Sequence, residues 1–167
     1  LKVSDVVTIW SPSKGQFCIL SKNGAIWKFS ISEQSPASLL CKSNRTISSN
    51  QVKSAVCEGG TLYFVDSEAK MWRLDEMSSG PMMLSDLSEL GEAGRTVSDI
   101  CSFAGNLFVG FYAGALARIP SSGGRCEVIA TDYRIFCLEK DLNQDILWIG
   151  TDGYGVFMYC DKPAKFN

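Results

Sequence analysis

Three side chains in glycine-containing turns have the types and positions best suited to ligand binding: Asp152, Tyr154 and Tyr112. A carboxylate can bind a metal ion or sugar hydroxyls, and the face of a tyrosine can stack on a sugar ring or on a partner chain. An aspartate in a turn more commonly bonds its own backbone, and we predict that role for Asp152. For the two tyrosines, ligand binding and packing on a neighbouring element fit the sequence equally well.

No pattern marks residues for catalysis or for a cofactor. The chain has no histidine, which excludes a histidine acid, base or triad, and its carboxylates do not stand at repeated positions. The stretch 150–155 reads G-x-x-G-x-G before a strand-like segment. A nucleotide-binding loop needs G-x-G-x-x-G before a helix, whose N-terminus holds the phosphate. We therefore predict no catalytic residues, no metal and no cofactor, and the sequence does not fix which residues bind a ligand.

The cysteines argue for thiols rather than for a disulfide framework or a zinc site. No two of them have Cys-x-x-Cys spacing, and their number is odd. We predict that most are buried and reduced and act as small apolar residues, although one or two disulfides remain possible. The seven are Cys18, Cys41, Cys57, Cys101, Cys126, Cys137 and Cys160.

Bulk composition excludes several classes of partner. The net charge of −2 and the pI near 5.2 give no general attraction to nucleic acid or to an anionic membrane surface. No apolar run approaches the roughly 18 residues that span a bilayer. The chain begins with Leu1 and shows no secretory signal, so we expect a piece of a longer protein or one whose leader has been removed.

Four hairpin-like segments position the candidate turns. In the last, residues 146–149 are apolar without a break, which predicts a strand covered on both faces, with Trp148 wedged between sheets. Gly153 and Gly155 suit a tight turn, and residues 156–159 suit a second strand. Similar segments begin at residues 16, 61 and 106. The aligned positions Trp27, Trp72, Ala117 and Phe157 are separated by 45, 45 and 40 residues.

Each hairpin has further strand-like segments beside it. Weak apolar stretches follow the first three hairpins, near residues 39–41, 82–84 and 128–129, and no complete outer strand is visible after Cys160. Paired apolar positions precede the four hairpins: Val7 and Trp10, Val52 and Ala55, Val97 and Ile100, and Ile135 and Leu138. A unit of about four strands repeated every 40–45 residues is typical of a β-propeller, whose sheets bury their faces by stacking on one another.

We predict an all-β propeller segment of about four four-stranded blades, forming one domain. The expected blades cover residues 1–45, 46–92, 93–131 and 132–167. An ordinary β-sandwich with chance similarity between its hairpins is the alternative. The four tryptophans (Trp10, Trp27, Trp72 and Trp148) are expected in the core, residues 85–90 are compatible with one helical turn that ends at Gly91, and residues 44–46 match a glycosylation acceptor.

The fourth segment, Leu147-Trp148-Ile149-Gly150-Thr151-Asp152-Gly153-Tyr154-Gly155-Val156-Phe157-Met158-Tyr159, resembles the two-component regulator propeller repeat. The third segment is similar more loosely, and the first two match mainly by pattern. This repeat is known from the periplasmic sensor region of Bacteroides-type hybrid two-component histidine kinases. The resemblance implies a larger propeller of about seven blades and ligands that are oligosaccharide breakdown products. It transfers no binding residue, because the residues of the motif are structural.

From this resemblance we expect a periplasmic sensor or ligand-recognition module without catalysis, whose parent chain carries a kinase. The expected partners are the remaining blades of the propeller. An oligosaccharide ligand and a homodimer are both compatible with the resemblance, and we expect no nucleic acid and no membrane contact. An intracellular protein-interaction scaffold in the cytoplasm is the first alternative, and a propeller lyase or glycosidase is the second.

Overall fold

A computed structural model describes residues 2–23, 25–30, 38–42, 52–75, 80–91, 94, 96–130, 132–141 and 143–160. The predicted glycosylation triplet at 44–46 and the tail at 161–167 lie outside these residues. Contacts divide the chain into two compact units, Leu1–Asp86 and Leu87–Asn167, and each is described by itself. Within the described residues, no helix is long and apolar enough to cross a membrane.

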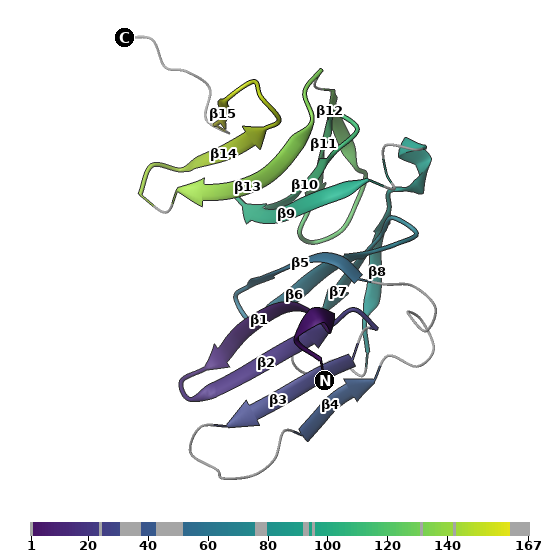
Figure 1. The fold of residues 1–167 in the computed structure, drawn as a ribbon, viewed down its shortest axis with the longest axis vertical. Coiled ribbons are helices and arrows are strands. Elements are labelled where there is room, and N and C mark those ends of the chain that lie inside the picture. Colours follow the sequence, from purple (N-terminus) through teal and green to yellow (C-terminus); the bar gives the residue numbers. More distant parts are fainter. Residues whose placement is uncertain are drawn as a thin grey trace. The chain divides into compact units, whose positions relative to one another are not determined.

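The first unit contains two antiparallel sheets of four strands, each with its strands in sequence order (Figure 1). A short 3₁₀ helix, η1 (Val3–Asp5), precedes the first sheet. The first sheet consists of β1 (Val6–Ser13), β2 (Gln16–Ser21), β3 (Ala25–Ser30) and β4 (Ser38–Lys42). The second consists of β5 (Val52–Glu58), β6 (Thr61–Asp66), β7 (Lys70–Leu74) and β8 (Met82–Asp86).

The second unit repeats the arrangement with one four-stranded sheet and one of three described strands. It opens with η2 (Ser88–Leu90), which Gly91 ends at a φ of 64°, so the predicted helical turn is confirmed in its last three residues. The third sheet consists of β9 (Val97–Phe103), β10 (Asn106–Phe111), β11 (Ala115–Pro120) and β12 (Glu127–Ala130). The fourth consists of β13 (Ile135–Asp141), β14 (Ile146–Thr151) and β15 (Val156–Tyr159). Four repeated sheets confirm the predicted architecture, whereas the blade boundaries stay a prediction.

Sheet packing in the first unit defines two faces that recur in every sheet. Face A of the second sheet carries Leu62, Phe64 and Trp72, and face B of the first sheet carries Cys18, Leu20 and Ile26. These six side chains form one buried cluster, together with Val52. Each sheet alternates its side chains between its two faces, so an apolar residue at every second position becomes buried when face A of one sheet covers face B of the sheet before it.

The second unit buries its core in the same way. Face B of the third sheet contributes Cys101, Phe108 and Leu116, and face A of the fourth sheet contributes Ile135, Leu138, Leu147 and Ile149. Two polar contacts reinforce this packing. The Asp99 carboxylate accepts a hydrogen bond from the backbone N–H of Leu138 at 2.9 Å, and Arg118 donates to the Tyr159 hydroxyl at 3.1 Å.

Strand register corrects two equivalences that the sequence predicted for the first sheet. Val6 is opposite Ser21 and Ile9 is opposite Ile19, as Ile135 is opposite Thr151 and Leu138 is opposite Ile149 in the fourth sheet. The equivalent residues are therefore Val6 and Ile9 rather than Val7 and Trp10. Val6 and Val7 are adjacent apolar residues, and so are Ile9 and Trp10. The alternation alone could therefore not show which residue of each pair lies on face A.

The expectation that all four tryptophans lie in the core is only partly correct. Trp72 is buried on face A of the second sheet, where the first sheet covers it. Trp27 occupies the same position in the first sheet but remains partly exposed, and Trp10 packs against the core cluster from its edge. Strand β14 is not covered on both faces: Leu147 and Ile149 are buried, whereas Ile146 and Trp148 alternate with them on face B and are partly exposed.

A polar side chain at the end of the second strand fixes the following turn in three sheets. Ser21 donates to the carbonyl of Ala25 at 2.8 Å, and Thr151 donates to that of Gly155 at 2.8 Å. Asp66 is buried and accepts hydrogen bonds from the backbone N–H groups of Glu68 and Lys70, at 2.9 and 3.0 Å, and from the Trp72 indole at 2.9 Å. These positions are 45 and 85 residues apart, so they are equivalent members of the repeat.

Candidate functional site

The candidate site lies at one end of the third and fourth sheets, where two hairpin turns meet the segments that precede the sheets. The turn between β10 and β11 contains Tyr112 and ends at Gly114, whose φ of 90° suits glycine. The backbone N–H of Tyr112 donates to the carbonyl of Thr96 at 2.8 Å, and that of Ala113 donates to the Thr96 hydroxyl at 3.1 Å. The segment before β9 thus holds this turn in place.

The turn between β14 and β15 is held in the same way. The backbone N–H of Asp152 donates to the carbonyl of Arg134 at 3.0 Å, and Gly153 and Gly155 have φ values of 77° and 87°. The first sheet makes the equivalent bond, from the Lys22 N–H to the carbonyl of Asp5 at 2.8 Å. This repeated bond places each turn beside the residues that precede its own sheet.

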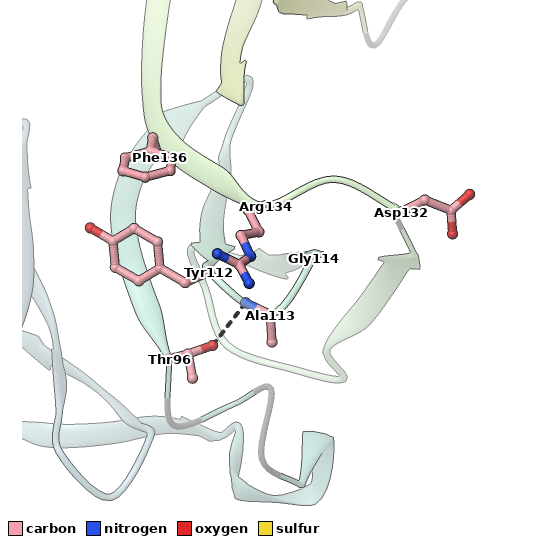
Figure 2. A pocket seen from close by; sticks show the side chains of 7 residues that line it. All are labelled: Thr96, Tyr112, Ala113, Gly114, Asp132, Arg134 and Phe136. Carbon is pink, nitrogen blue, oxygen red and sulfur yellow. Dashed lines mark hydrogen bonds between the residues drawn. The ribbon is translucent and has the colours of Figure 1, made fainter. Parts of the chain in front are cut away.

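A first hollow of about 500 Å³ lies beside the Tyr112 turn. Figure 2 shows Arg134 extending towards this turn, with Tyr112 and Phe136 to one side and Asp132 to the other. The Tyr112 and Phe136 rings meet edge to face, with centroids 5.1 Å apart. Both rings keep nearly half of their surface exposed, so their packing leaves room for a ligand to contact them.

A second hollow of about 640 Å³ adjoins the Tyr154 turn and shares Asp132 and Arg134 with the first. Tyr133 stacks on Phe157 at a centroid distance of 5.1 Å and contacts Tyr154 at 4.6 Å. Tyr154 remains 66% exposed. Arg134 is therefore the cation common to two hollows with aromatic groups beside them.

An exposed ion pair links the two sides of the second hollow. Arg134 Nη1 lies 3.8 Å from Asp152 Oδ2, and both side chains are largely exposed. Such a pair contributes little to stability, so a ligand hydroxyl can replace either partner, and a ligand carboxylate can replace Asp152, at small cost. The groups present can donate and accept hydrogen bonds and can stack, which suits a polar ligand that has one apolar face.

The predicted site residues are brought together only in part. Tyr112 and Tyr154 each pack on another aromatic ring and each line a hollow, so the packing alternative is confirmed and ligand binding stays a prediction. Asp152 differs from the prediction: its carboxylate pairs with Arg134 rather than with its own turn. The reason is the position of Arg134, whose carbonyl already receives the Asp152 N–H.

Sequence reasoning missed the segment that enters β13: the loop before this strand supplies Asp132, Tyr133 and Arg134, and the second residue of the strand is Phe136. The available signal was a run of charged and aromatic residues directly before a predicted strand. No group of three or more histidine, cysteine, aspartate or glutamate residues that could hold a metal ion occurs in the part of the chain that the structure describes.

The cysteines also differ from expectation. Of the six whose side chains are described, Cys18 and Cys101 are buried, two are intermediate, and Cys137 and Cys160 are exposed. The prediction that most are buried is therefore wrong for these six, because several lie at strand ends, and Cys137 lies on face B of the fourth sheet, on which no sheet packs within the described part of its unit. No disulfide joins any two of the six. Burial raises the pKa of the Cys101 thiol to about 11.

Comparison with known proteins supports the fold. No protein-family model matches the sequence, and no curated protein matches it. The computationally designed Ika4 protein is similar over 96% of this chain and 93% of its own, with a TM-score of 0.68 and 13% identity. The extracellular domain of a putative hybrid two component system from B. thetaiotaomicron is similar over 93% of this chain and 21% of its own, with a TM-score of 0.63 and 18% identity.

The WD40 β-propeller domain of Doa1 is similar over 93% of this chain and 51% of its own, with a TM-score of 0.64 and 9% identity. The chain thus spans nearly all of the designed protein, about half of the WD40 chain and about a fifth of the two-component domain. Identities this low carry the fold alone. Together with four repeated antiparallel sheets that pack face A on face B within each unit, they show that the chain is a β-propeller segment.

Proposed function

We propose that this propeller segment is the ligand-recognition part of an extracytoplasmic sensor in a hybrid two-component protein, and that it binds carbohydrate without catalysis. The observation that carries the proposal is the pair of hollows around Arg134, with Tyr112 and Tyr154 exposed beside them. Sugar rings have apolar C–H faces that stack on aromatic rings and hydroxyl edges that bond to carboxylates and guanidinium groups. The extracellular two-component domain with the same fold supports the choice of a sensor.

The proposal is tested by screening the chain against a panel of neutral and acidic oligosaccharides and titrating any binder by calorimetry. We expect Tyr154→Ala and Arg134→Ala each to weaken binding about tenfold, which corresponds to about 1.4 kcal/mol. Lys22→Ala is the matched control, because Lys22 occupies the equivalent turn of the first sheet. Failure of every oligosaccharide to bind at millimolar concentration, or binding that survives both site variants, would contradict the proposal.

A protein-interaction scaffold in the cytoplasm is the second candidate. It is favoured by the apolar side chains that the fourth sheet exposes, among them Val156 and Met158. Such side chains are more typical of a surface that meets another protein than of a sugar-binding one. A partner protein that binds the wild-type chain, and that loses binding on Val156→Lys but not on Tyr154→Ala, would support this candidate over the first.

A further inference from the structure

Face B of the fourth sheet is an exposed apolar surface. Val156 and Met158 are each 64% exposed, Ile146 and Trp148 are partly exposed, and Cys137 is exposed. The register of β13, β14 and β15 puts Trp148 beside Met158 and Gly150 beside Val156 on this face. Neighbouring apolar groups on a flat sheet face form a patch suited to contact with another protein surface.

This patch has the same construction as the surface that holds the fourth sheet on the third. Trp148, Gly150 and Val156 stand where face B of the third sheet has Phe108, Gly110 and Leu116. Phe108 and Leu116 are buried against face A of the fourth sheet.

The two faces differ at the positions that make polar contacts. Asp99 and Arg118 link the third sheet to the fourth through Leu138 and Tyr159. The equivalents of Asp99 and Arg118 in the fourth sheet are Cys137 and Met158. Face B of the fourth sheet thus has the form of a docking surface and depends more on apolar contact than its counterpart does.

The complementary surface is present on the same chain, at face A of the first sheet. Ile9 is 59% exposed and Phe17 is 38% exposed, and both lie on this face beside partly exposed neighbours. In the second and fourth sheets, the equivalent side chains on face A pack against face B of the preceding sheet and form the core there. The face consists of Val6, Ile9, Phe17, Ile19, Trp27 and Phe29, matching Ile135, Leu138, Leu147, Ile149, Phe157 and Tyr159 of the fourth sheet.

We propose that a second copy of this chain docks its first sheet, by face A, onto face B of the fourth sheet. The contact would repeat the A-on-B packing that each unit already contains. A patch three strands wide and five residues long covers about 240 Å². Two such contacts between two copies would involve four patches of about 960 Å² in total, which is below the roughly 1,200–2,000 Å² of stable complexes and is typical of a weak association that depends on concentration. The contact is heterologous, since it joins two different surfaces.

The test is the solution mass of the chain, measured by light scattering over a range of concentrations. Wild-type protein should exceed the monomer mass of 18.3 kDa, and the excess should grow with concentration. Ile9→Lys places a charge on face A of the first sheet, and Met158→Lys places one on face B of the fourth sheet. In either variant every copy lacks one of the two docking faces, so each variant alone should be a monomer. An equimolar mixture of the two retains one intact pair of faces, which is half of the wild-type contact, and should form a one-to-one dimer only at higher concentration than the wild type needs.

Val128→Lys is the matched control, because Val128 is exposed on the outermost strand of the third sheet and lies on neither docking face. This variant should associate like the wild type, and circular dichroism should show that all variants keep their strand content. A wild-type monomer at every concentration would overturn the proposal. So would a mixture of the two lysine variants that stays monomeric at every concentration, or association that persists in either variant alone.

Discussion

The substitution Gly110→Ala should destabilise the packing of the fourth sheet on the third. A Cβ at Gly110 would lie 2.6 Å from Cγ2 of Ile135 and 3.0 Å from the Ser98 hydroxyl. Carbon atoms in contact are normally about 3.5–4.0 Å apart, so one of the groups must move by about 1 Å. Ile135 cannot do so easily, because it is fully buried and its branched side chain has restricted rotamers. Overpacking of this kind costs about 1–3 kcal/mol.

The matched control is Gly150→Ala, at the equivalent position of β14. Its Cβ would lie 2.5 Å from the Cys137 sulfur, but Cys137 is exposed and its side chain can rotate into solvent. Alanine also restricts the unfolded chain, which stabilises a protein by about 0.4–1 kcal/mol where the backbone conformation permits it. Neither glycine has a positive φ, so alanine can adopt the backbone conformation at both positions. We expect Gly150→Ala to be close to neutral and Gly110→Ala to cost about 1–2 kcal/mol net.

Urea titration of both variants at one protein concentration measures the difference. Gly110→Ala should lower the transition midpoint without changing its slope, and amide exchange should become faster in β13. The reasoning is wrong if Gly110→Ala is as stable as the wild type, or if the two variants lose equal stability. In the second case the closeness of Ile135 would not be the cause.

Three further outcomes follow from burial and hydrogen bonding. Leu147→Ala should cost about 2–5 kcal/mol in denaturant titration of the monomer, because Leu147 is fully buried. Trp148→Ala should cost clearly less, because Trp148 is partly exposed in a single copy of the chain; equal losses would contradict the register of β14. Asp66→Asn should cost about 1–3 kcal/mol, since it turns an amide N–H₂ towards the Trp72 indole N–H, and an unchanged melting temperature would refute this bond. Burial raises the pKa of the Cys101 thiol from 9.0 to about 11, so the stability that this thiol contributes is complete below pH 9 and is lost as the pH rises to about 11. Cys101→Ala should therefore lose less stability than the wild type between pH 9 and 11. Identical pH profiles of the two proteins would show that Cys101 is not the cause of the loss.

The repeat could be predicted from the sequence because each hairpin places apolar residues at the same spacing. The aligned positions at Trp27 and Trp72 are indeed equivalent in the register of their sheets. Burial could not be predicted in the same way. Trp27 and Trp72 have the same local pattern, but only Trp72 has a sheet packed on its face within its unit. Burial of a sheet face depends on the neighbouring sheet, which periodicity does not encode.

The candidate site was visible only in its turns. Tyr112 and Tyr154 stood out because each lies in a glycine-containing turn. Arg134 and Phe136 did not, because they become neighbours of these turns through the backbone bonds of Tyr112 and Asp152 to segments about 16 to 18 residues away in sequence. Such contacts depend on how the strands of a sheet fold back on one another, and no residue pattern in the loop specifies them.

Amide chemical shifts during titration with an oligosaccharide test the central claim most directly. The account predicts that the shifts concentrate at Thr96, at Tyr112 to Gly114, at Asp132 to Arg134 and at Asp152 to Tyr154, which surround the two hollows. The equivalent turn of the first sheet, at Lys22, should not respond. Shifts centred on other surfaces, or no shifts with any oligosaccharide at millimolar concentration, would contradict recognition of carbohydrate at this site.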